Sequence, residues 1–282
     1  MSVNADKINL LGMSQDMLEQ FFAERDENPF RARQILQWIY QRGVTDFDEM
    51  TDLSRKLRDR LKDEAEIVLP EVQSRFDSKD GTVKWLFATD CGQAVETVFI
   101  PEPGRGTLCI SSQVGCALDC AFCATGAQDF NRNLTKAEII GQVFVANSEL
   151  PCRENGEPAV TNIVFMGMGE PLANYRNVIP VLKLLISDWS YGLSRRRVTI
   201  STSGIVPHLE KLGDECNVSL AVSLHAPNDD LRNIIVPNNK MLPIAEHHYA
   251  SWPYAAKHSK RYITYEYVML LGVYDSSAHD DD

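Results

Sequence analysis

The hydrophobic pattern of the N-terminal part of the chain is helical. Between Pro29 and Arg42, the apolar residues Ile35, Trp38 and Ile39 recur at spacings of three and four positions. This spacing places them on one face of a helix. The pattern predicts a small helical accessory domain over residues 1–72.

The period changes to two between Arg75 and Ser112. Apolar and polar residues alternate in Val83–Phe87 and again in Val95–Phe99, and Asp90-Cys91-Gly92 lies between these two runs. Two alternating runs separated by such a turn signal are typical of a β-hairpin. We therefore expect residues 73–106 to form a hairpin that leads into the rest of the chain.

Beyond residue 107, apolar strand-like runs alternate with helical stretches, which predicts a parallel sheet with crossover helices. One of these helices begins with a capping box, Thr135-x-x-Glu138. Five units are too few for a closed barrel of eight. The predicted fold class is therefore α/β, with a partial (β/α) barrel over residues 107–282. Its strand-like runs are Thr107–Ser112, Thr161–Met166, Arg197–Ser203, Val218–His225 and Arg261–Leu270.

Composition agrees with a soluble globular protein. The chain has 282 residues, of which 44% are hydrophobic and 24% charged, so it can bury a sizeable core. No apolar stretch reaches the roughly 18 to 20 residues of a membrane span, and Met1 to Leu10 lacks the apolar stretch of a signal peptide. These features predict a cytoplasmic protein without a membrane partner.

The net charge of −11 argues weakly against a nucleic-acid partner. The distribution of charge is more informative, because Thr51–Lys62 holds five basic and two acidic residues, and Arg195–Arg197 is a second basic run. Such runs are either solvated helix and loop faces or the electrostatic footprint of a nucleic-acid site. Taken alone, the runs favour solvated faces.

Three of the seven cysteines form a metal-ligand pattern. Cys116, Cys120 and Cys123 have the spacing C-x3-C-x2-C in the loop after the first barrel strand. Three thiolates can hold three irons of a cubane cluster and leave the fourth iron open to a substrate. A structural zinc site needs four ligands, and no fourth Cys or His lies nearby at a suitable spacing. We expect metal or redox chemistry in a reducing compartment, not a disulfide framework.

Further candidate residues follow later strands. Gly167-Met-Gly-Glu-Pro171 comes directly after one strand, Ser201 ends the next, and Ser223-Leu224-His225 ends the one after that. Glycines let the backbone approach a ligand closely, and ligands of barrel folds gather at the carboxyl ends of the strands. Without the cysteines, a lone Gly-x-Gly and two strand-end hydroxyls would be weak signals.

The cysteine motif, with an aromatic residue before its last cysteine, resembles that of the radical S-adenosylmethionine (SAM) superfamily. The resemblance implies a [4Fe-4S] cluster whose open iron binds SAM. An electron from the cluster then cleaves SAM to methionine and a 5'-deoxyadenosyl radical. It also implies that Gly169 and Glu170 contact the methionyl amino group. The residues implied for the ribose and carboxylate region of SAM are Ser201, Ser223, Leu224 and His225.

Longer motifs are similar to those of the RlmN family, which methylates C2 of adenine in 23S ribosomal RNA and in transfer RNA. The resemblance implies both RNAs as partners, an RNA-binding N-terminal domain and an electron donor such as flavodoxin. The matching segments are Pro29–Arg33, Cys109–Cys116, Phe130–Leu134, Gly167–Pro171, Arg196–Gly204 and Ser223–Pro227.

The same resemblance gives roles to two residues outside these loops. Glu96 would accept the C2 proton, and Cys109 would be the resolving thiol that is left in a disulfide. The residues alone leave other interpretations open. Glu96 could be a solvent-facing residue of an alternating strand, and Cys109 a small buried hydrophobe.

One element of the family pattern is missing. The family carries a methyl-bearing cysteine in a C-terminal segment, and the contexts of Cys91, Cys152 and Cys216 do not resemble it. We therefore expect a truncated or altered copy that binds a cluster without completing methyl transfer. The rival functions are the sister enzyme that methylates C8 of adenine and a catalytically inactive RNA-binding remnant.

Overall fold

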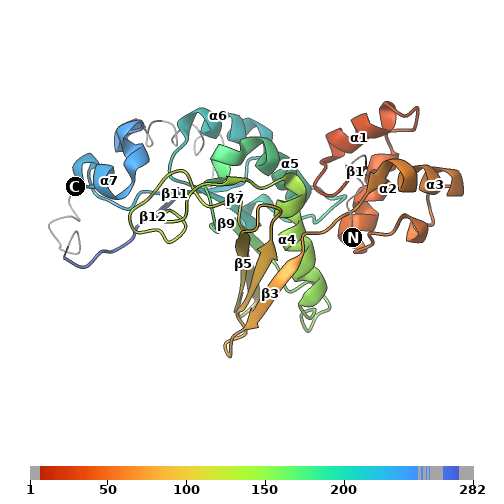
Figure 1. Cartoon of the computed structure of the whole chain (residues 1–282), viewed down its shortest axis with the longest axis horizontal. Coiled ribbons are helices and arrows are strands. Elements are labelled where there is room, and N and C mark those ends of the chain that lie inside the picture. Colours follow the sequence, from red (N-terminus) through yellow and green to blue (C-terminus); the bar gives the residue numbers. More distant parts are fainter. Residues whose placement is uncertain (1–6, 247–248, 250–251, 253, 255–262, 273–282) are drawn as a thin grey trace.

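The computed structural model describes residues 7–246, 249, 252, 254 and 263–272. Figure 1 shows three parts in a row. A group of N-terminal helices lies at one end, a strand hairpin projects from the middle, and a curved sheet with its covering helices extends to the other end.

The N-terminal part is helical, as predicted. Its helices bury apolar side chains such as Leu57 and Leu61 of α3, and the hydroxyl of Ser54 caps α3 by accepting a hydrogen bond from the amide of Leu57. The helix expected between Pro29 and Arg42 is present as α2, which continues into one π-helical turn. The elements are β1 (Ile8–Asn9), α1 (Gln15–Ala23), α2 (Arg31–Leu36), η1 (Gln37–Gln41), η2 (Phe47–Glu49), α3 (Arg55–Glu64) and β2 (Ala65–Glu66), and β1 pairs with β2.

One eight-stranded sheet contains both the hairpin and the barrel strands, in the order β12-β11-β10-β9-β6-β5-β4-β3. The pairs from β3 to β6 are antiparallel, and those among β6, β9, β10, β11 and β12 are parallel. The predicted hairpin (β4 and β5) and the five parallel strands are confirmed. The bounds are β3 (Val72–Asp77), β4 (Val83–Ala88), β5 (Ala94–Glu102), β6 (Arg105–Cys109), β9 (Asn162–Phe165), β10 (Val198–Thr202), β11 (Ser219–Ser223) and β12 (Thr264–Glu266).

Helices connect the parallel strands. The predicted capping box is present at the start of α4, where Thr135 and Glu138 each satisfy a backbone amide of the other. These helices are α4 (Lys136–Glu149), α5 (Tyr175–Ile186), α6 (Val206–Glu215) and α7 (Asp229–Ile235). Shorter elements are β7 (Gln113–Val114), β8 (Arg132–Asn133), η3 (Pro171–Asn174), η4 (Arg195–Arg197) and η5 (Pro237–Lys240).

The hydrophobic core runs without interruption from the N-terminal helices into the barrel, since buried side chains of both parts belong to one cluster. Polar contacts cross the same boundary. The side-chain amide of Gln41 donates to the carbonyl of Asp188 at 2.8 Å, and Lys183 forms an ion pair with Asp16 at 3.1 Å. The division at residues 72 and 106 remains a prediction.

Within the described part of the chain, no helix combines the length and apolar character that a membrane span requires.

Candidate active site

A cavity of about 310 Å³ lies at the carboxyl ends of the parallel strands. Its volume is in the range of small-ligand sites. Eight of the predicted site residues line it together, although they come from separate segments of the chain. These residues are Cys116, Cys120, Cys123, Gly169, Glu170, Ser201, Ser223 and His225.

The three cysteines lie on one tight loop. The amide of Cys123 donates to the carbonyl of Cys120 at 3.0 Å, and a Cβ on Gly126 would come within 2.9 Å of that carbonyl oxygen. Burial, followed by the charges of the neighbouring thiols, raises the pKa of the Cys120 thiol to about 12. Burial also raises the pKa of Cys116. Thiolates in this position need a nearby positive charge, which bound iron would supply.

Among the described residues, no three His, Cys, Asp or Glu side chains are arranged to hold one metal ion. A cubane cluster has a different requirement, because each thiolate binds a separate iron and the sulfurs therefore stand farther apart. Three thiols on one cavity wall fit that requirement.

The segment Gly167–Glu170 needs glycine for steric reasons. The amide of Gly167 donates to the carbonyl of Ile110 at 3.1 Å. Gly169 has φ of +92°, and a Cβ there would lie 2.3 Å from Cβ of Gln113. The side-chain oxygen of Gln113 also accepts a hydrogen bond from the amide of Glu170 at 2.8 Å. Gln113 thus fixes the wall on which the cosubstrate is expected.

Glu170 is buried and held by three donors. Its carboxylate accepts from the amide and hydroxyl of Ser203, at 2.9 and 3.2 Å, and from the amide of Leu172 at 3.0 Å. Burial raises the pKa of Glu170, and these hydrogen bonds oppose the rise. The carboxylate therefore connects the glycine segment to the loop after β10.

Glu266, which no sequence motif indicated, joins the two predicted serines. Its Oε2 accepts from the hydroxyl of Ser201 at 2.7 Å and from that of Ser223 at 3.1 Å. The side chain lines the cavity, and a lone acid within the run Tyr265-Glu266-Tyr267 was the available signal. Two hydroxyls around a carboxylate make a wall suited to ligand hydroxyl or ammonium groups.

His225 forms another part of the wall. Its backbone is left-handed, with φ of +62°, and its ring meets the edge of Phe122 at a centroid distance of 4.6 Å. Its buried Nδ1 has no hydrogen-bond partner in the part of the chain that the structure describes. Burial lowers the pKa of His225, which favours the neutral ring. The backbone amide of Leu224, the preceding residue, donates a hydrogen bond to the carbonyl of Glu266 at 3.0 Å, but Leu224 is not among the lining residues.

Glu96 and Cys109 lie outside the lining of this cavity. Cys109 pairs with Val98 across β5 and β6, and Glu96 is two residues from Val98, so both side chains are on one face of the sheet. Glu96 is exposed and forms an ion pair with Lys84 at 3.1 Å. Burial raises the pKa of Cys109 to about 11, and the charge of Glu266 adds to the rise.

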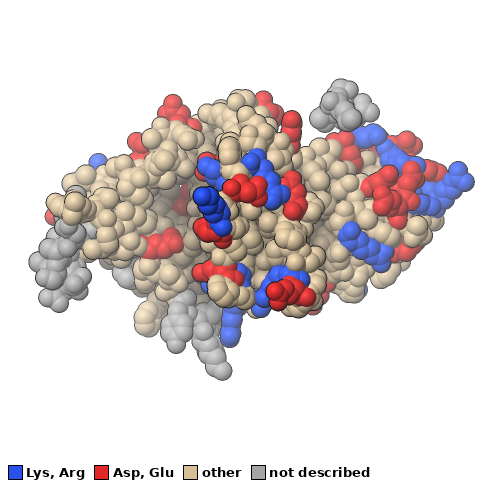
Figure 2. Space-filling view, turned by 90° about the horizontal axis from the view of Figure 1, so that it is seen from below, with Lys and Arg blue, Asp and Glu red and all other residues tan. Residues whose placement is uncertain are grey.

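The basic run on α3 is largely paired with acids. Lys62 contacts Asp48 and Asp59, Arg60 contacts Glu64, and Arg55 contacts Asp59. Figure 2 shows this mixture, with blue and red side chains interleaved over the N-terminal helices. The pairing reduces the positive charge that this run could offer to a nucleic acid.

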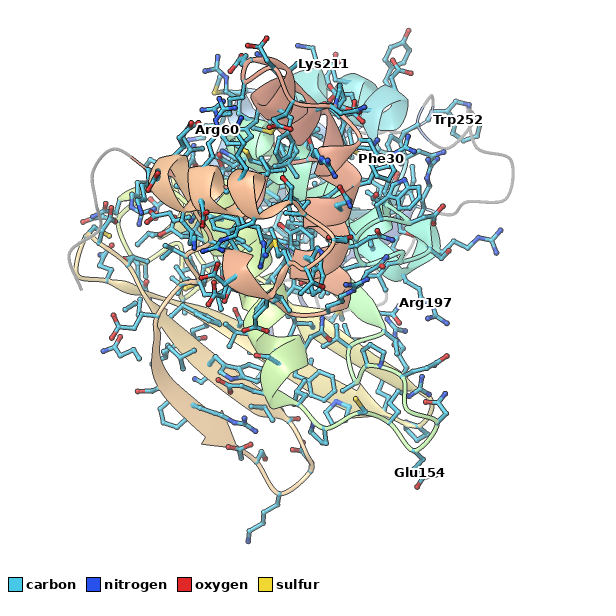
Figure 3. All side chains as sticks on the ribbon, turned by 90° about the vertical axis from the view of Figure 1, so that its right-hand side faces the viewer. Phe30, Arg60, Glu154, Arg197, Lys211 and Trp252 are labelled. Carbon is cyan, nitrogen blue, oxygen red and sulfur yellow. The ribbon has the colours of Figure 1, made fainter. Side chains whose placement is uncertain are left out.

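The second basic run lies elsewhere. Arg195–Arg197 precedes β10, so it stands at the amino end of the strand, whereas the cavity is at the carboxyl end. In Figure 3, Arg197 is well separated from Arg60 of α3. The two runs do not form one continuous basic surface.

Comparison with known proteins assigns a family. Residues 8–67 match the model of the ribosomal RNA large subunit methyltransferase N-terminal domain, and residues 110–280 match the radical SAM superfamily. A dual-specificity RNA methyltransferase RlmN from Marinobacter nauticus is 55% identical over 277 residues, which cover 98% of this chain and 75% of the relative.

A solved structure agrees with this match. The crystal structure of a radical SAM methyltransferase from Sphaerobacter thermophilus superposes with a TM-score of 0.86 at 41% identity, covering 97% of this chain and 80% of the other. The predicted fold class and the resemblance based on the cysteine motif are confirmed. The chain belongs to the RlmN family of the radical SAM superfamily.

Proposed function

We propose that the protein is a SAM-dependent RNA methyltransferase that acts on C2 of adenine in ribosomal and transfer RNA. The observation that carries the proposal is the cavity at the strand ends, which combines three cysteines with the Gly169–Glu170 segment and a hydroxyl-carboxylate wall. The relative from Marinobacter nauticus, named a dual-specificity RNA methyltransferase, supports RNA as the substrate class.

The proposed ligands of a [4Fe-4S] cluster are Cys116, Cys120 and Cys123, because these three thiols share one cavity wall. When bound, the cluster supplies the electron that splits the sulfonium of SAM. The chain's own residues then have positioning tasks. Gly169 lets the backbone approach the cosubstrate, while Ser201, Ser223 and Glu266 offer acceptors to its hydroxyl and amino groups.

Leu224 and His225 complete this proposed cosubstrate site. The amides of both residues donate to the carbonyl of Glu266, which fixes the turn after β11. Nδ1 of the neutral His225 ring, which has no partner among the described residues, can bind a polar atom of the cosubstrate.

For the steps that follow SAM cleavage, we propose that Glu96 accepts the proton from C2 of adenine and that Cys109 is the resolving thiol. Their position on one face of the sheet supports this pairing. The ion pair with Lys84 keeps the Glu96 carboxylate oriented along β4 and β5.

The N-terminal helices are the proposed RNA-binding part, and the match of residues 8–67 to the methyltransferase N-terminal domain supports this. The exposed ring of Phe30, and the exposed Lys56, for which the described part of the chain offers no ion pair, are better candidates for RNA contacts than the paired cations of α3. An electron donor such as flavodoxin belongs to the same proposal.

The proposal can be tested without RNA. The 282-residue chain would be reconstituted anaerobically with iron and sulfide, reduced, and assayed for 5'-deoxyadenosine release from SAM. We expect about four irons per chain, and we expect Cys120→Ala to abolish release. Cys152→Ala is the matched control, because Cys152 is exposed and outside the cavity.

Two outcomes would overturn the assignment: a single zinc in place of the cluster, or unchanged SAM cleavage by Cys120→Ala. Release of 5'-deoxyadenosine also separates an enzyme from an inactive RNA-binding remnant. Liquid chromatography with mass detection, run against 2-methyladenosine and 8-methyladenosine standards, distinguishes methylation at C2 from methylation at C8.

A further inference from the structure

Arg232 is a fully buried arginine on α7 that holds the ends of two strands. Its Nε donates to the carbonyl of Leu224 at 2.8 Å, and its Nη2 donates to the carbonyls of Ser203 and Ser223, both at 3.0 Å. Its Nη1 donates to the side-chain oxygen of Asn239. One guanidinium thus connects the segments that follow β10 and β11, where Ser203 and Ser223 line the cavity.

The helix that carries Arg232 also supports the cysteine loop. The amide of Ala121, which lies between two of the predicted iron ligands, donates to the carbonyl of Ile235 at 3.0 Å. Cys120 and Phe122 pack against a small apolar cluster that includes Ile235. Arg232 is therefore placed between the strand ends and the loop that would hold the cluster.

Arg232 places a positive charge close to this loop. It lies one helical turn before Ile235, whose carbonyl binds Ala121, and its strand-end partners Ser203 and Ser223 line the same cavity as Cys120. The four acceptors described above are uncharged carbonyl or amide oxygens, and Asp229 is an acid that acts on Arg232 through its charge. In a buried setting, charges interact more strongly than they do in water.

We propose that Arg232 is a positioning residue of the radical site, which fixes the strand ends against the cysteine loop and raises the reduction potential of the cluster held there. This inference rests on the proposed function. Reduction adds one negative charge to the cluster, and a buried cation nearby stabilises the reduced form.

The test compares substitutions at Arg232 and Asp229 that should shift the midpoint potential of the cluster in opposite directions. Arg232→Gln removes the charge but keeps an amide donor, so the cluster midpoint should become more negative. Arg232→Lys keeps the charge, so its midpoint should stay near that of the unchanged protein. Asp229→Asn keeps the oxygen that accepts from Asn239 and Ile244 but removes a negative charge, so the midpoint should become more positive.

The midpoints would be measured on the reconstituted 282-residue protein by redox titration monitored by electron paramagnetic resonance. The control is Arg176→Met, which removes an exposed arginine from α5 and should leave the midpoint unchanged. Arg232→Gln should also weaken SAM binding by about tenfold. The guanidinium would no longer donate hydrogen bonds to the carbonyls at the ends of β10 and β11, where the proposed SAM site lies.

Unchanged midpoints in both Arg232→Gln and Asp229→Asn would overturn the inference. If Arg232→Gln does not fold, Asp229→Asn decides, because a positive shift supports the inference and any other result contradicts it. Iron analysis keeps the two proposals apart. A protein without a cluster refutes the proposed function, whereas a cluster with an unresponsive midpoint refutes only the role of Arg232.

Discussion

Glu170 and Arg232 show how buried charges shape the cavity at the residue scale. Removing a charge from water is costly unless hydrogen bonds replace the lost hydration. Glu170 receives three such bonds, and Arg232 donates three to the ends of β10 and β11 and one to Asn239 of η5. Because the strand ends at β10 and β11 are tied to these groups, the cavity is preorganised before a ligand arrives.

The cysteines of the metal-free protein should differ in reactivity. Cys152 is exposed, and the hydroxyl of Thr89 lowers the pKa of Cys91, so both should react first with iodoacetamide near neutral pH. Burial raises the pKa of Cys109 to about 11 and that of Cys216 to about 12. Their alkylation should be slow and should rise about tenfold per pH unit below these values.

Peptide mass mapping after timed alkylation at two pH values measures this order. Labelling of Cys216 as fast as that of Cys152 at neutral pH would contradict the description of Cys216 as a buried thiol.

The residues of the site were only partly predictable from the sequence. Cys116, Cys120, Cys123 and the Gly169–Glu170 pair stand in motifs with fixed spacing, so they could be found without coordinates. Arg232 and Glu266 stand in no such motif. Their roles depend on carbonyl and hydroxyl groups that approach only when separate strands pair, and neither hydrophobic period nor residue spacing reports that approach.

At the scale of elements, the close contact between the Gly167–Glu170 segment and Gln113 should be sensitive to one methyl group. Gly169→Ala introduces a Cβ at 2.3 Å from Cβ of Gln113, in addition to backbone strain at a φ of +92°. Gly156 has a φ of +79°, and a Cβ there would meet no atom within 4 Å. Gly156→Ala should therefore cost about 1 to 2 kcal/mol of backbone strain, and Gly169→Ala clearly more.

Urea unfolding of both variants measures the difference. Equal losses in the free energy of unfolding would show that the contact with Gln113 is not tight.

The capping box of α4 makes a second prediction at this scale. Burial favours the neutral form of Glu138, but hydrogen bonds from Arg132 and Thr135 outweigh it and lower its pKa below the usual 4.5. A lowered pKa contributes stability above the unfolded-state pKa, and this stability is lost as pH falls through the folded-state value. Glu138→Gln should destabilise the protein by about 1 to 2 kcal/mol at neutral pH.

Thermal melting of both proteins from neutral pH to well below 4.5 tests this expectation. The difference in melting temperature between the two proteins should become smaller as the pH falls. A difference in melting temperature that stays constant with pH would mean that the charge of Glu138 does not contribute to stability.

Most elements were predicted because the periodic pattern of apolar residues in the sequence matches the pattern of buried residues in the structure. The strand β4 alternates buried and partly exposed residues from Val83 to Ala88, as expected. The strand β3 was missed, since none of its residues is fully buried and its sequence does not alternate clearly between apolar and polar residues. The two-residue strands β7 and β8 depend on pairing between distant segments and have no local signal.

At the scale of the whole molecule, the N-terminal helices and the barrel should unfold together. The guanidinium of Arg33 lies 5.0 Å from the ring of Trp189, and the rings of Tyr40 and Tyr191 are 5.3 Å apart. The core that includes such contacts is continuous across the boundary. Neither part can lose its structure without exposing apolar surface of the other.

Gly141 of α4 tests this coupling, because a Cβ there would lie 2.2 Å from Cδ of Pro70, in the segment that joins the two parts. Alanine normally stabilises a helix interior by about 1 kcal/mol relative to glycine, so a net loss of stability would report the blocked contact. We expect Gly141→Ala to lower the melting temperature while circular dichroism and tryptophan fluorescence still show one coincident transition. Two separate transitions in the unchanged protein would mean that the shared core does not couple the helices to the barrel.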